Sequence, residues 1–446
     1  MLRHQLFKLT HELASPGFNS MYHRLSDNQW ASRSNLRNQQ EKNLHNAINY
    51  AYNNVPFYNK MLKSRGLRPE NIRTIEDLKK LPIINKNVIR ENWKDLIPRG
   101  LSKLSYYDRT TGGSTGNPLQ YRITKFDRFL SGALMYRGWS YSGYELGDKM
   151  FFLGGSSIGL GKKSQLSHFA NEFARNTKML SSFDLDNTEM ENYVNKLNIN
   201  KPSYGYGYAS SLYFFSKWIE KTDISVHSPK AIYTTAETLL PHMRKTIEAV
   251  FNCEVHNAYG LNDGGVSAHE CSEHSGLHID TERSVMEVVD SDEQIESGSG
   301  HIVATSLWNN SMPFIRYDTG DIGTISDELC SCGRGHMLLK EIAGRQQELL
   351  LTPEGKYIHG EFFSHIIWEI DNIIEFQVVQ EDLHTIVIKI IPDGVFDRKQ
   401  NDTIIDYIHR RSPTWNVKIQ LVDKIDKTIG GKYRFVINNM NTNIIP

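Results

Sequence analysis

The sequence has no excess of either charge. Its 446 residues include 51 lysines and arginines and 51 aspartates and glutamates, which gives a formal net charge of zero. A protein whose main partner is nucleic acid or an anionic membrane is usually enriched in lysine and arginine, so the composition argues against both partners. The length instead allows two or three domains with ample core.

Long apolar runs are also missing. The first residues mix apolar side chains with Arg3, His4 and Lys8, and they contain no uninterrupted apolar stretch of the length found in signal peptides. No uncharged apolar run elsewhere approaches the roughly 20 residues of a membrane span. We therefore expect a cytoplasmic protein without a membrane span.

Cysteine is scarce, with four residues in the chain. In a reducing compartment, so few cysteines are better suited to be metal ligands or free thiols than disulfides. We expect Cys253 to be a buried strand residue. The other three are Cys271, Cys330 and Cys332.

These three cysteines have histidine neighbours in a pattern that could bind zinc. Cys271 is followed by His274 and His278, and Cys330 and Cys332 come about fifty residues later. Three thiols and one imidazole could complete a tetrahedral structural zinc site. We prefer His278 to His274 as the fourth ligand because it lies in a strand-like segment. Small buried or free thiols are the alternative.

The apolar pattern predicts an α/β fold. Residues 36–95 have helical spacing, which Pro56 interrupts. From about 105 to 330, strand-like runs alternate with helical stretches, and this alternation favours largely parallel sheets. The predicted strands are 149–153, 231–234 and 254–258, the predicted helices are 210–220 and 241–250, and hairpins are predicted over 302–325.

The pattern changes after residue 344. A strand over 385–391, a helix over 401–411 and a strand over 417–422 indicate a smaller mixed unit of ordinary domain size. We therefore expect a large N-terminal domain, 1–344, with parallel-rich sheets, and a small mobile α+β C-terminal lobe, 345–446.

Two segments about 300 residues apart suggest phosphate chemistry. Residues 110–118 form a loop of glycines and hydroxyls, which lets backbone N–H groups approach an anion. Lys432 lies in a glycine-containing segment, 427–432, and its long stem suits a charge that must reach a phosphate and a carboxylate. Alone, the first could be a polar hairpin and the second a solvated lysine. Residues 155–164 lack the spacing of a Walker-type P-loop.

Further segments in a fixed order carry a family resemblance. They are 51–58, 77–83, 233–238, 256–263, 313–321 and 342–348. Together with the loop and Lys432, they resemble the adenylate-forming superfamily, and more closely its phenylacetate–CoA ligase branch. The resemblance covers about residues 45–435 and is far more specific than any one segment.

The resemblance implies a role for each matching residue. The predicted catalytic residues are Lys432, which would bridge carboxylate and α-phosphate, Asp263, which would ligate Mg²⁺, and Thr111. The nucleotide-binding residues would be Thr110, Gly112, Gly113, Ser114, Thr115 and Gly116 at the β- and γ-phosphates, Ala236, Glu237, Asn257, Ala258, Tyr259 and Gly260 around the adenine, and Asp321 and Arg345 at the ribose. The zinc ligands would be Cys271, His278, Cys330 and Cys332, since some members of the branch have a comparable site.

The sequence departs from the family pattern at a few of these positions. Asp263 stands where the family usually has glutamate, so magnesium could be held through water. Leu119 stands where many members have lysine. Gln347 replaces the usual hinge Asp or Lys, which leaves the details of lobe rotation open.

The predicted activity is ATP-dependent activation of a carboxylic acid as acyl-AMP. Coenzyme A is the expected acceptor, and an amine on a sugar or amino acid is the alternative. A nucleotide-binding homologue without catalysis is the competing class, since fold alone does not establish function. Aromatic residues over 204–211 favour a flat or aromatic acid. The sequence leaves the oligomeric state open, with a homodimer as one expectation.

Overall fold

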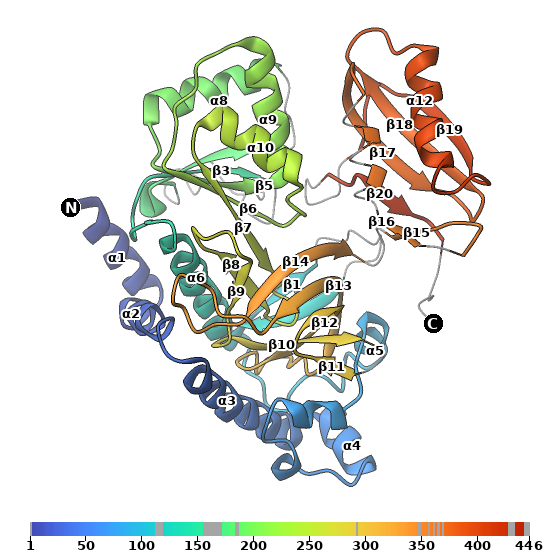
Figure 1. Ribbon diagram of the computed structural model, residues 1–446. Helices are drawn as coiled ribbons and strands as arrows, with labels where there is room; N and C mark the ends of the chain where they lie inside the picture. The colour runs from blue at the N-terminus through green and yellow to red at the C-terminus, as the bar shows by residue number, and fades with distance from the viewer. Residues whose placement is uncertain are drawn as a thin grey trace. The chain divides into compact units, whose positions relative to one another are not determined.

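The computed structural model of the protein describes most of the chain. The described residues are 2–111, 119–154, 172–182, 187–290, 293–345, 349–355, 357–359, 362–363, 366–367, 370–426 and 433–440. The chain divides into two compact units, 1–343 and 344–446 (Figure 1). This division lies next to the boundary expected from the sequence, and the roles assigned to the two units stay predictions.

The first unit begins with helices; those within 36–95 were predicted from the apolar spacing, whereas α1 and α2 were not. The Ser32 side chain caps the longest of them by accepting a hydrogen bond from the Asn35 backbone N–H. Pro56 opens the next helix at its first position, where its missing N–H costs nothing. The helices are α1 (Leu2–Ala14), α2 (Phe18–Asn28), α3 (Arg33–Asn54), α4 (Pro56–Ser64) and α5 (Lys86–Glu91), with 3₁₀ turns η1 (Pro69–Asn71), η2 (Glu76–Lys80) and η3 (Lys103–Ser105).

A large sheet forms the centre of this unit, with strand order β11-β10-β12-β13-β14-β9-β8-β7-β6-β5-β3-β4. One half is parallel, and helices α8, α9 and α10 gather over it (Figure 1). Strand β3 is buried along its whole length and β6 at all but its last residue, as in strands with both faces covered. The elements are β3 (Met150–Gly154), β4 (Thr177–Ser181), α8 (Asn187–Asn200), β5 (Tyr204–Tyr208), α9 (Ala209–Thr222), β6 (Ala231–Thr235), α10 (Pro241–Phe251) and β7 (Glu254–Gly260).

The other half of the sheet is built from antiparallel pairs, among them β7–β8, β8–β9, β9–β14 and β12–β13. Buried and less buried residues alternate along β13, as in a sheet with one covered face. The strands are β8 (Ser267–Glu270), β9 (Leu277–Ile279), β10 (Ser284–Asp290), β11 (Glu293–Ile295), β12 (Gly298–Ser306), β13 (Tyr317–Ser326) and β14 (Leu338–Arg345). The α/β fold class is confirmed. Parallel pairing stops at β7. The strands beyond β7 pair antiparallel, and such pairs need no helical crossover between them.

A two-stranded ribbon, β1 (Tyr106–Thr110) and β2 (Gln120–Thr124), precedes helix α6 (Lys125–Ser140). The Thr124 side chain caps α6 by accepting a hydrogen bond from the Asp127 backbone N–H. The ribbon therefore connects the predicted phosphate loop directly to a helix that packs beside α2 (Figure 1).

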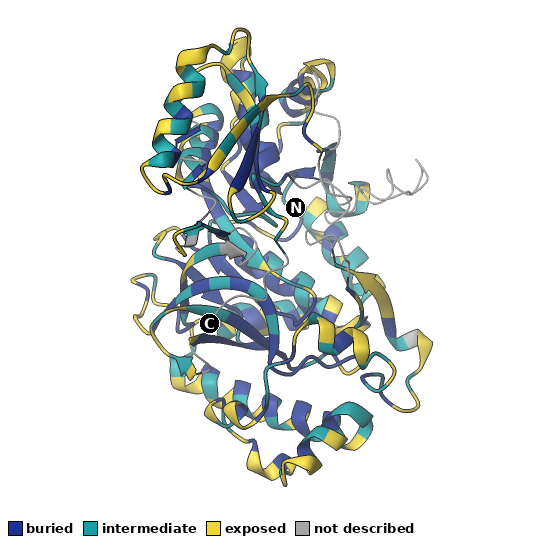
Figure 2. Cartoon of the chain, turned by 90° about the vertical axis from the view of Figure 1, so that its right-hand side faces the viewer, coloured by how far each residue is buried: buried dark blue, intermediate teal, exposed yellow. Residues whose placement is uncertain are grey.

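The N-terminal segment is fastened to the start of β13. The Tyr58 hydroxyl donates to the Pro313 carbonyl (2.9 Å) and accepts from the Ile315 N–H (3.1 Å). Ile84 makes a parallel bridge there, with its N–H bonded to the Arg316 carbonyl. Tyr58 and Ile84 also belong to a continuous apolar core under the antiparallel half. Figure 2 shows buried residues along the strands and exposed residues on the outer sides of helices.

In its described residues, the second unit has a four-stranded sheet with order β19-β18-β17-β20 and the helix α12. Parallel pairing of β18 with β19 requires a crossover, which α12 provides. This helix begins at Arg398, earlier than the sequence pattern indicated, because Asp397 and Gln400 form a capping box. The elements are β15 (Leu349–Leu351), β16 (Tyr357–His359), β17 (Ile373–Gln380), β18 (Thr385–Pro392), α12 (Arg398–His409), β19 (Asn416–Leu421) and β20 (Val436–Asn438).

The prediction for Cys253 is wrong. Helix α10 ends at Phe251 with Asn252 in the left-handed region (φ 49°), so the chain turns before β7 starts at Glu254. Cys253 lies in this turn and is only partly buried. Among the described residues, no helix has the length and apolar character needed to cross a membrane.

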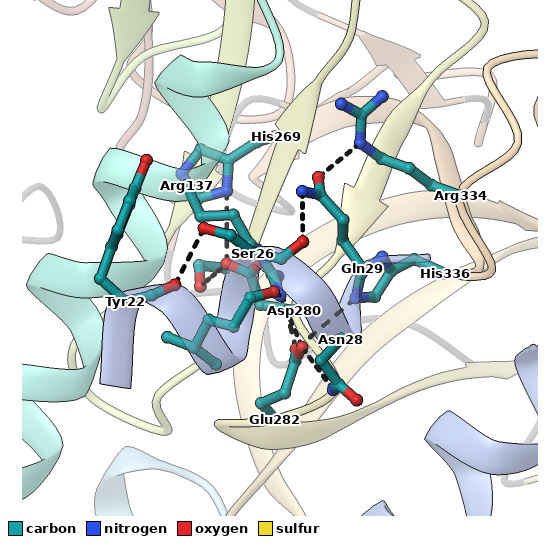
Figure 3. A network of polar contacts seen from close by, with 12 residues as sticks. Tyr22, Ser26, Asn28, Gln29, Arg137, His269, Asp280, Glu282, Arg334 and His336 are labelled. Carbon is teal, nitrogen blue, oxygen red and sulfur yellow. Dashed lines mark hydrogen bonds and ion pairs between the residues drawn. The ribbon is translucent and has the colours of Figure 1, made fainter. Parts of the chain in front are cut away.

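A buried ionic network joins α6 to the sheet (Figure 3). Arg137 is fully buried and contacts Asp280 and Glu282, with N–O distances of 2.5 Å to each. His269 lies 3.3 Å from Asp280, and His336 lies 3.6 Å from Glu282. Burial alone would raise the pKa of Glu282, but Arg137 and His336 hold it well below its ordinary value. Both carboxylates are therefore charged, and Arg137 compensates them.

The same network reaches the N-terminal helices. Asn28, at the end of α2, donates to Glu282 (3.0 Å). Gln29 accepts a hydrogen bond from Arg334 Nε (2.8 Å), and the Arg334 guanidinium stacks on Trp30 and Tyr141. Polar contacts thus hold α2 against the turn that precedes β14 (Figure 3).

We predict that Arg137→Ala lowers the free energy of unfolding of the large unit by about 3–5 kcal/mol, because two buried carboxylates lose their cation. Urea denaturation followed by tryptophan fluorescence measures the change. The control is Arg37→Ala, which removes a surface pair with Glu41 and Glu76 and should cost under about 1 kcal/mol. Equal losses in the two variants would contradict the importance of the buried network.

Candidate functional site

The ends of β6 and β7 lie side by side and carry the predicted adenine segment. The two strands pair in parallel, with Thr234 opposite Asn257. The Thr234 hydroxyl donates to Asn257 Oδ1 at 3.1 Å. Residues 236–237, which follow β6, and residues 257–260, which end β7, therefore lie at the carboxyl end of the parallel strands, where ligands bind in open α/β sheets.

The turn after β6 has an unusual backbone. Ala236 has φ +70°, a left-handed conformation that is uncommon for a residue with a Cβ. The next side chain, Glu237, accepts a hydrogen bond from the Ser210 N–H at the start of α9 (2.9 Å). This contact fixes the turn to the neighbouring helix. Residues held in uncommon backbone conformations occur frequently at binding sites.

Asp321 is linked to the adenine segment by a side-chain contact. It lies on β13, is 5% exposed, and accepts a hydrogen bond from the Tyr259 hydroxyl at 2.8 Å. Its N–H donates to Thr319 Oγ1. The predicted ribose carboxylate and the β7 end thus belong to one arrangement, although 62 residues separate them in the chain.

Asp263, the predicted magnesium ligand, is buried next to a tyrosine. The Tyr317 hydroxyl donates to Asp263 Oδ2 at 3.1 Å. Burial, with the charge of Asp263 nearby, raises the pKa of both Tyr317 and Tyr121, so both keep their hydroxyl protons. Sequence reasoning missed Tyr317, because its partner lies 54 residues away and no local pattern marks the pair.

The residue before Asp263 is also anchored. Asn262 Oδ1 accepts from Arg283 Nη2 (3.4 Å), and Arg283 makes two hydrogen bonds to Asp127 of α6 (3.1 and 3.0 Å). The side chains of Arg283 and Asp127 are both buried. The polar turn that carries Asp263 is therefore connected to the helix that follows the ribbon β1–β2.

The base of the phosphate loop is closed by backbone contacts. The Thr111 N–H donates to the Leu119 carbonyl, and Thr111 Oγ1 accepts from the Leu119 N–H, both at 2.9 Å. Thr110 ends β1. The predicted loop residues Gly112, Gly113, Ser114, Thr115 and Gly116 lie outside the described residues, as do Lys432 and residues 155–164. Arg345 is described only as the backbone end of β14.

The aromatic residues expected near the acyl group lie in the core of the parallel half. Tyr204 and Tyr208 are at most 1% exposed, and Tyr206 contacts Trp139 with ring centroids 5.1 Å apart. An acyl pocket lined by these residues stays a prediction.

The structure brings the four predicted zinc ligands together. Cys271 follows β8, His278 lies on β9, and Cys330 and Cys332 lie in the turn before β14. Antiparallel pairing of His278 with Leu338 aligns these segments. The Cys271 and Cys330 sulfurs are 3.7 Å apart, and Cys332 Sγ is 3.4 Å from His278 Nε2. One ligand atom from each residue lies within 4.8 Å of all the others.

These distances fit a tetrahedral metal better than a disulfide. Metal–sulfur bonds of about 2.3 Å place two sulfurs roughly 3.8 Å apart, whereas a disulfide needs about 2.05 Å. Burial, then the charges of His336 and Arg334, lower the pKa of His278 to about 3, so its imidazole is neutral and can act as a ligand. The donor set therefore fits zinc.

His274, the alternative ligand, lies elsewhere. Its ring stacks on His256, with centroids 5.0 Å apart and an interplanar angle of 19°.

Comparisons with known proteins find chains of similar sequence and similar fold. The profile of the CapK C-terminal domain family matches residues 350–439. Protein CapK of Staphylococcus aureus is 28% identical over 397 residues, which cover 88% of this chain and 87% of that protein. A phenylacetate–coenzyme A ligase of Thermus thermophilus is 27% identical and covers 72% of each chain.

A solved structure of a 2-hydroxyisobutyryl-CoA ligase in its postadenylation state, in complex with an acyl-AMP, shares the fold. Its TM-score is 0.72 at 18% identity, and the match covers 90% of this chain and 89% of the ligase. The chain is therefore a homologue of CapK and of the phenylacetate–coenzyme A ligases, and it has the fold of a ligase solved with an acyl-AMP.

Proposed function

We propose that the protein is an AMP-forming acyl ligase. A carboxylate oxygen attacks the α-phosphorus of ATP, pyrophosphate leaves, and the acyl-AMP then transfers its acyl group to the thiol of coenzyme A with release of AMP. The observation that carries this proposal is the homology to phenylacetate–coenzyme A ligases across 72% of the chain. Because ATP and coenzyme A are cytoplasmic compounds, we propose a cytoplasmic enzyme.

The strand ends supply the nucleotide site in this proposal. Residues 236–237 and 257–260 would flank the adenine, and Asp321, held by Tyr259, would accept from the ribose hydroxyls with Arg345 assisting. Residues 110–116 would hold the β- and γ-phosphates. The contacts of Glu237 and Asp321 support a site that is formed before ATP binds, which reduces the cost of ordering it.

Asp263 would hold magnesium through its carboxylate, a hard oxygen ligand. The metal, when bound, would neutralise charge on the phosphates. Tyr317 would orient the carboxylate by donating to Oδ2. This hydrogen bond and the Arg283–Asp127 pair behind Asn262 support a fixed position for the carboxylate.

Lys432 would stabilise the charge that develops as the carboxylate attacks phosphorus. We propose that the C-terminal unit brings this lysine to the site for adenylation and withdraws it for transfer, so that one site serves two half-reactions.

The Cys271, His278, Cys330 and Cys332 cluster would hold a structural zinc ion. Four protein ligands leave no open position for a substrate, as in structural rather than catalytic sites. The ion would fasten the turn of residues 330–332 to β8 and β9.

An amine acceptor is the second candidate. CapK matches 88% of the chain and the CapK domain covers the lobe around Lys432, whereas the phenylacetate relatives match 72%. This difference in coverage is the reason to test an acceptor other than coenzyme A. A homodimer remains a prediction without a structural test.

The activity is tested by product mass. We predict that the purified protein with ATP, magnesium, coenzyme A and a panel of aromatic and hydroxy acids releases pyrophosphate only with a suitable acid and forms its coenzyme A thioester. Replacing coenzyme A with an amino sugar tests the second candidate, which yields an amide. Measurable ATP binding without any adenylate would instead indicate a binding protein without catalysis.

We predict that Lys432→Ala reduces pyrophosphate exchange roughly 10²–10³-fold, because one charge that stabilises the transition state is lost. ATP affinity, measured on the same preparation, should change little, because the lysine acts mainly in the transition state. Lys424→Ala is the control, since Lys424 is an exposed lysine of the same unit. Unchanged exchange in Lys432→Ala would remove the lysine from catalysis.

We predict about one tightly held zinc ion per chain and its loss in Cys330→Ser, together with a lower midpoint of thermal unfolding. Elemental analysis of protein never exposed to chelator measures the metal. Cys253→Ser is the matched control, because Cys253 lies outside the cluster and should leave zinc unchanged. Wild-type protein without zinc would refute a structural zinc site.

A further inference from the structure

A second group of ligating side chains lies beside the zinc cluster. Glu254 and His256 are two residues apart on β7 and so point to the same face of the strand. His274 comes from the turn after β8, which is closed by the His274 N–H bonded to the Cys271 carbonyl (3.1 Å). One turn therefore places Cys271 in the first cluster and His274 in the second.

The spacing of the three side chains suits a metal ion. One ring nitrogen of each histidine and one carboxylate oxygen of Glu254 lie within 4.8 Å of one another. His256 Nε2 is 3.4 Å from Glu254 Oε2. Bonds of about 2.1 Å to a tetrahedral ion place ligand atoms roughly 3.4 Å apart. The Glu254 and His274 side chains are 63% and 33% exposed. Both are therefore able to move from the present spacing to the roughly 3.4 Å that a tetrahedral ion requires.

His256 lacks a hydrogen-bond partner in the described part of the chain. Its side chain is 1% exposed, and neither ring nitrogen makes a hydrogen bond there. A buried polar group without a partner costs about 1–3 kcal/mol. A neutral imidazole has a lone pair that a metal ion can use.

The Glu270 carboxylate lies next to the His274 ring. Its Oε1 lies 3.3 Å from His274 Nδ1, and its two oxygens accept from Arg244 Nη2 at 3.0 and 2.9 Å. Glu270 therefore compensates the charge of the Arg244 guanidinium, which would otherwise repel a metal ion near the His274 ring. Arg244 Nη1 lies 3.3 Å from the same Nδ1 and is neutralised by Glu270.

We infer that Glu254, His256 and His274 form a second metal site, for a divalent ion of the zinc, cobalt and nickel class. Two imidazoles and one carboxylate select such ions over magnesium or calcium, which prefer all-oxygen ligands. The site has three protein ligands and open positions, so it binds more weakly than the four-ligand cluster. It contains no thiolate, which distinguishes it spectroscopically from the first site.

The position of this site relates it to the nucleotide segment. Glu270 also accepts a hydrogen bond from the Asn257 N–H (2.6 Å), directly after His256 on β7. A bound ion therefore reinforces the middle of the strand whose end carries residues 257–260.

Equilibrium dialysis of the full-length protein, as purified, against graded Co²⁺ tests the inference. We expect about one exchangeable cobalt per chain without thiolate-to-cobalt charge-transfer absorption. His274→Ala and Glu254→Gln should each weaken this binding at least about tenfold, since each removes a ligand. His384→Ala is the matched control, because it removes an exposed imidazole in the other unit and should leave cobalt binding unchanged.

The same experiment distinguishes the two metal sites from each other. Cys330→Ser should remove tightly held zinc and leave the exchangeable cobalt, whereas His274→Ala should do the opposite. Cobalt binding unaffected by both His274→Ala and Glu254→Gln, or bound cobalt that shows thiolate absorption and disappears in Cys330→Ser, overturns the second site. Neither result depends on ligase activity, so failure of the proposed reaction is distinguishable.

Discussion

The change of pairing along β7 is the constraint on which the large unit depends. Residues 254–257 of this strand pair in parallel with β6, and residues 258–260 pair antiparallel with β8. The parallel side fixes where Asn257 and Thr234 meet. The antiparallel side turns the chain back immediately, so that Cys271 and His274 return to the flank of the same strand. One seven-residue strand thus organises the nucleotide segment and both groups of metal-ligating side chains.

Compensated charge is the second organising feature. The buried cations Arg137, Arg283 and Arg316 each face carboxylates from distant parts of the chain, namely Asp280 and Glu282, Asp127, and Glu287. Each carboxylate would be expensive to bury alone. The pairs therefore fix which elements meet: α6 against the sheet, and β13 against β10. These contacts specify position more than they add stability.

Elements whose position depends on a short-range sequence pattern were predicted well. The predicted bounds of β3, β6 and β7 agree with the structure within a residue or two, because β-branched and aromatic residues favour strands locally. The start of α12 was set by the Asp397–Gln400 capping box, a local signal that the helical spacing alone did not reveal. The prediction for Cys253 was wrong because a turn of one or two residues decides whether a position belongs to the strand. The family resemblance, not residue spacing, supplied the roles of Asp321 and Lys432.

Long-range pairing was beyond sequence reasoning. The residue types at Cys271, His278, Cys330 and Cys332 already indicated a metal cluster, and the structure adds the pairing of β9 with β14 that gathers them. Nothing near Tyr317 indicates Asp263, and nothing near His256 indicates His274, because each contact depends on how separate turns return to the sheet.

The hydrogen bonds between Tyr58 and residues 313–315 have a consequence for synthesis on the ribosome. The hydroxyl group and its backbone partner are 255 residues apart in the chain. Translation at 5–20 residues per second makes the N-terminal helices wait roughly 10–50 s for the strand that covers them. During that interval Tyr58, Leu62 and their neighbours, fully buried in the finished protein, have no native surface to pack against. The emerging chain is therefore a natural client for chaperones that hold apolar helices until the sheet is complete.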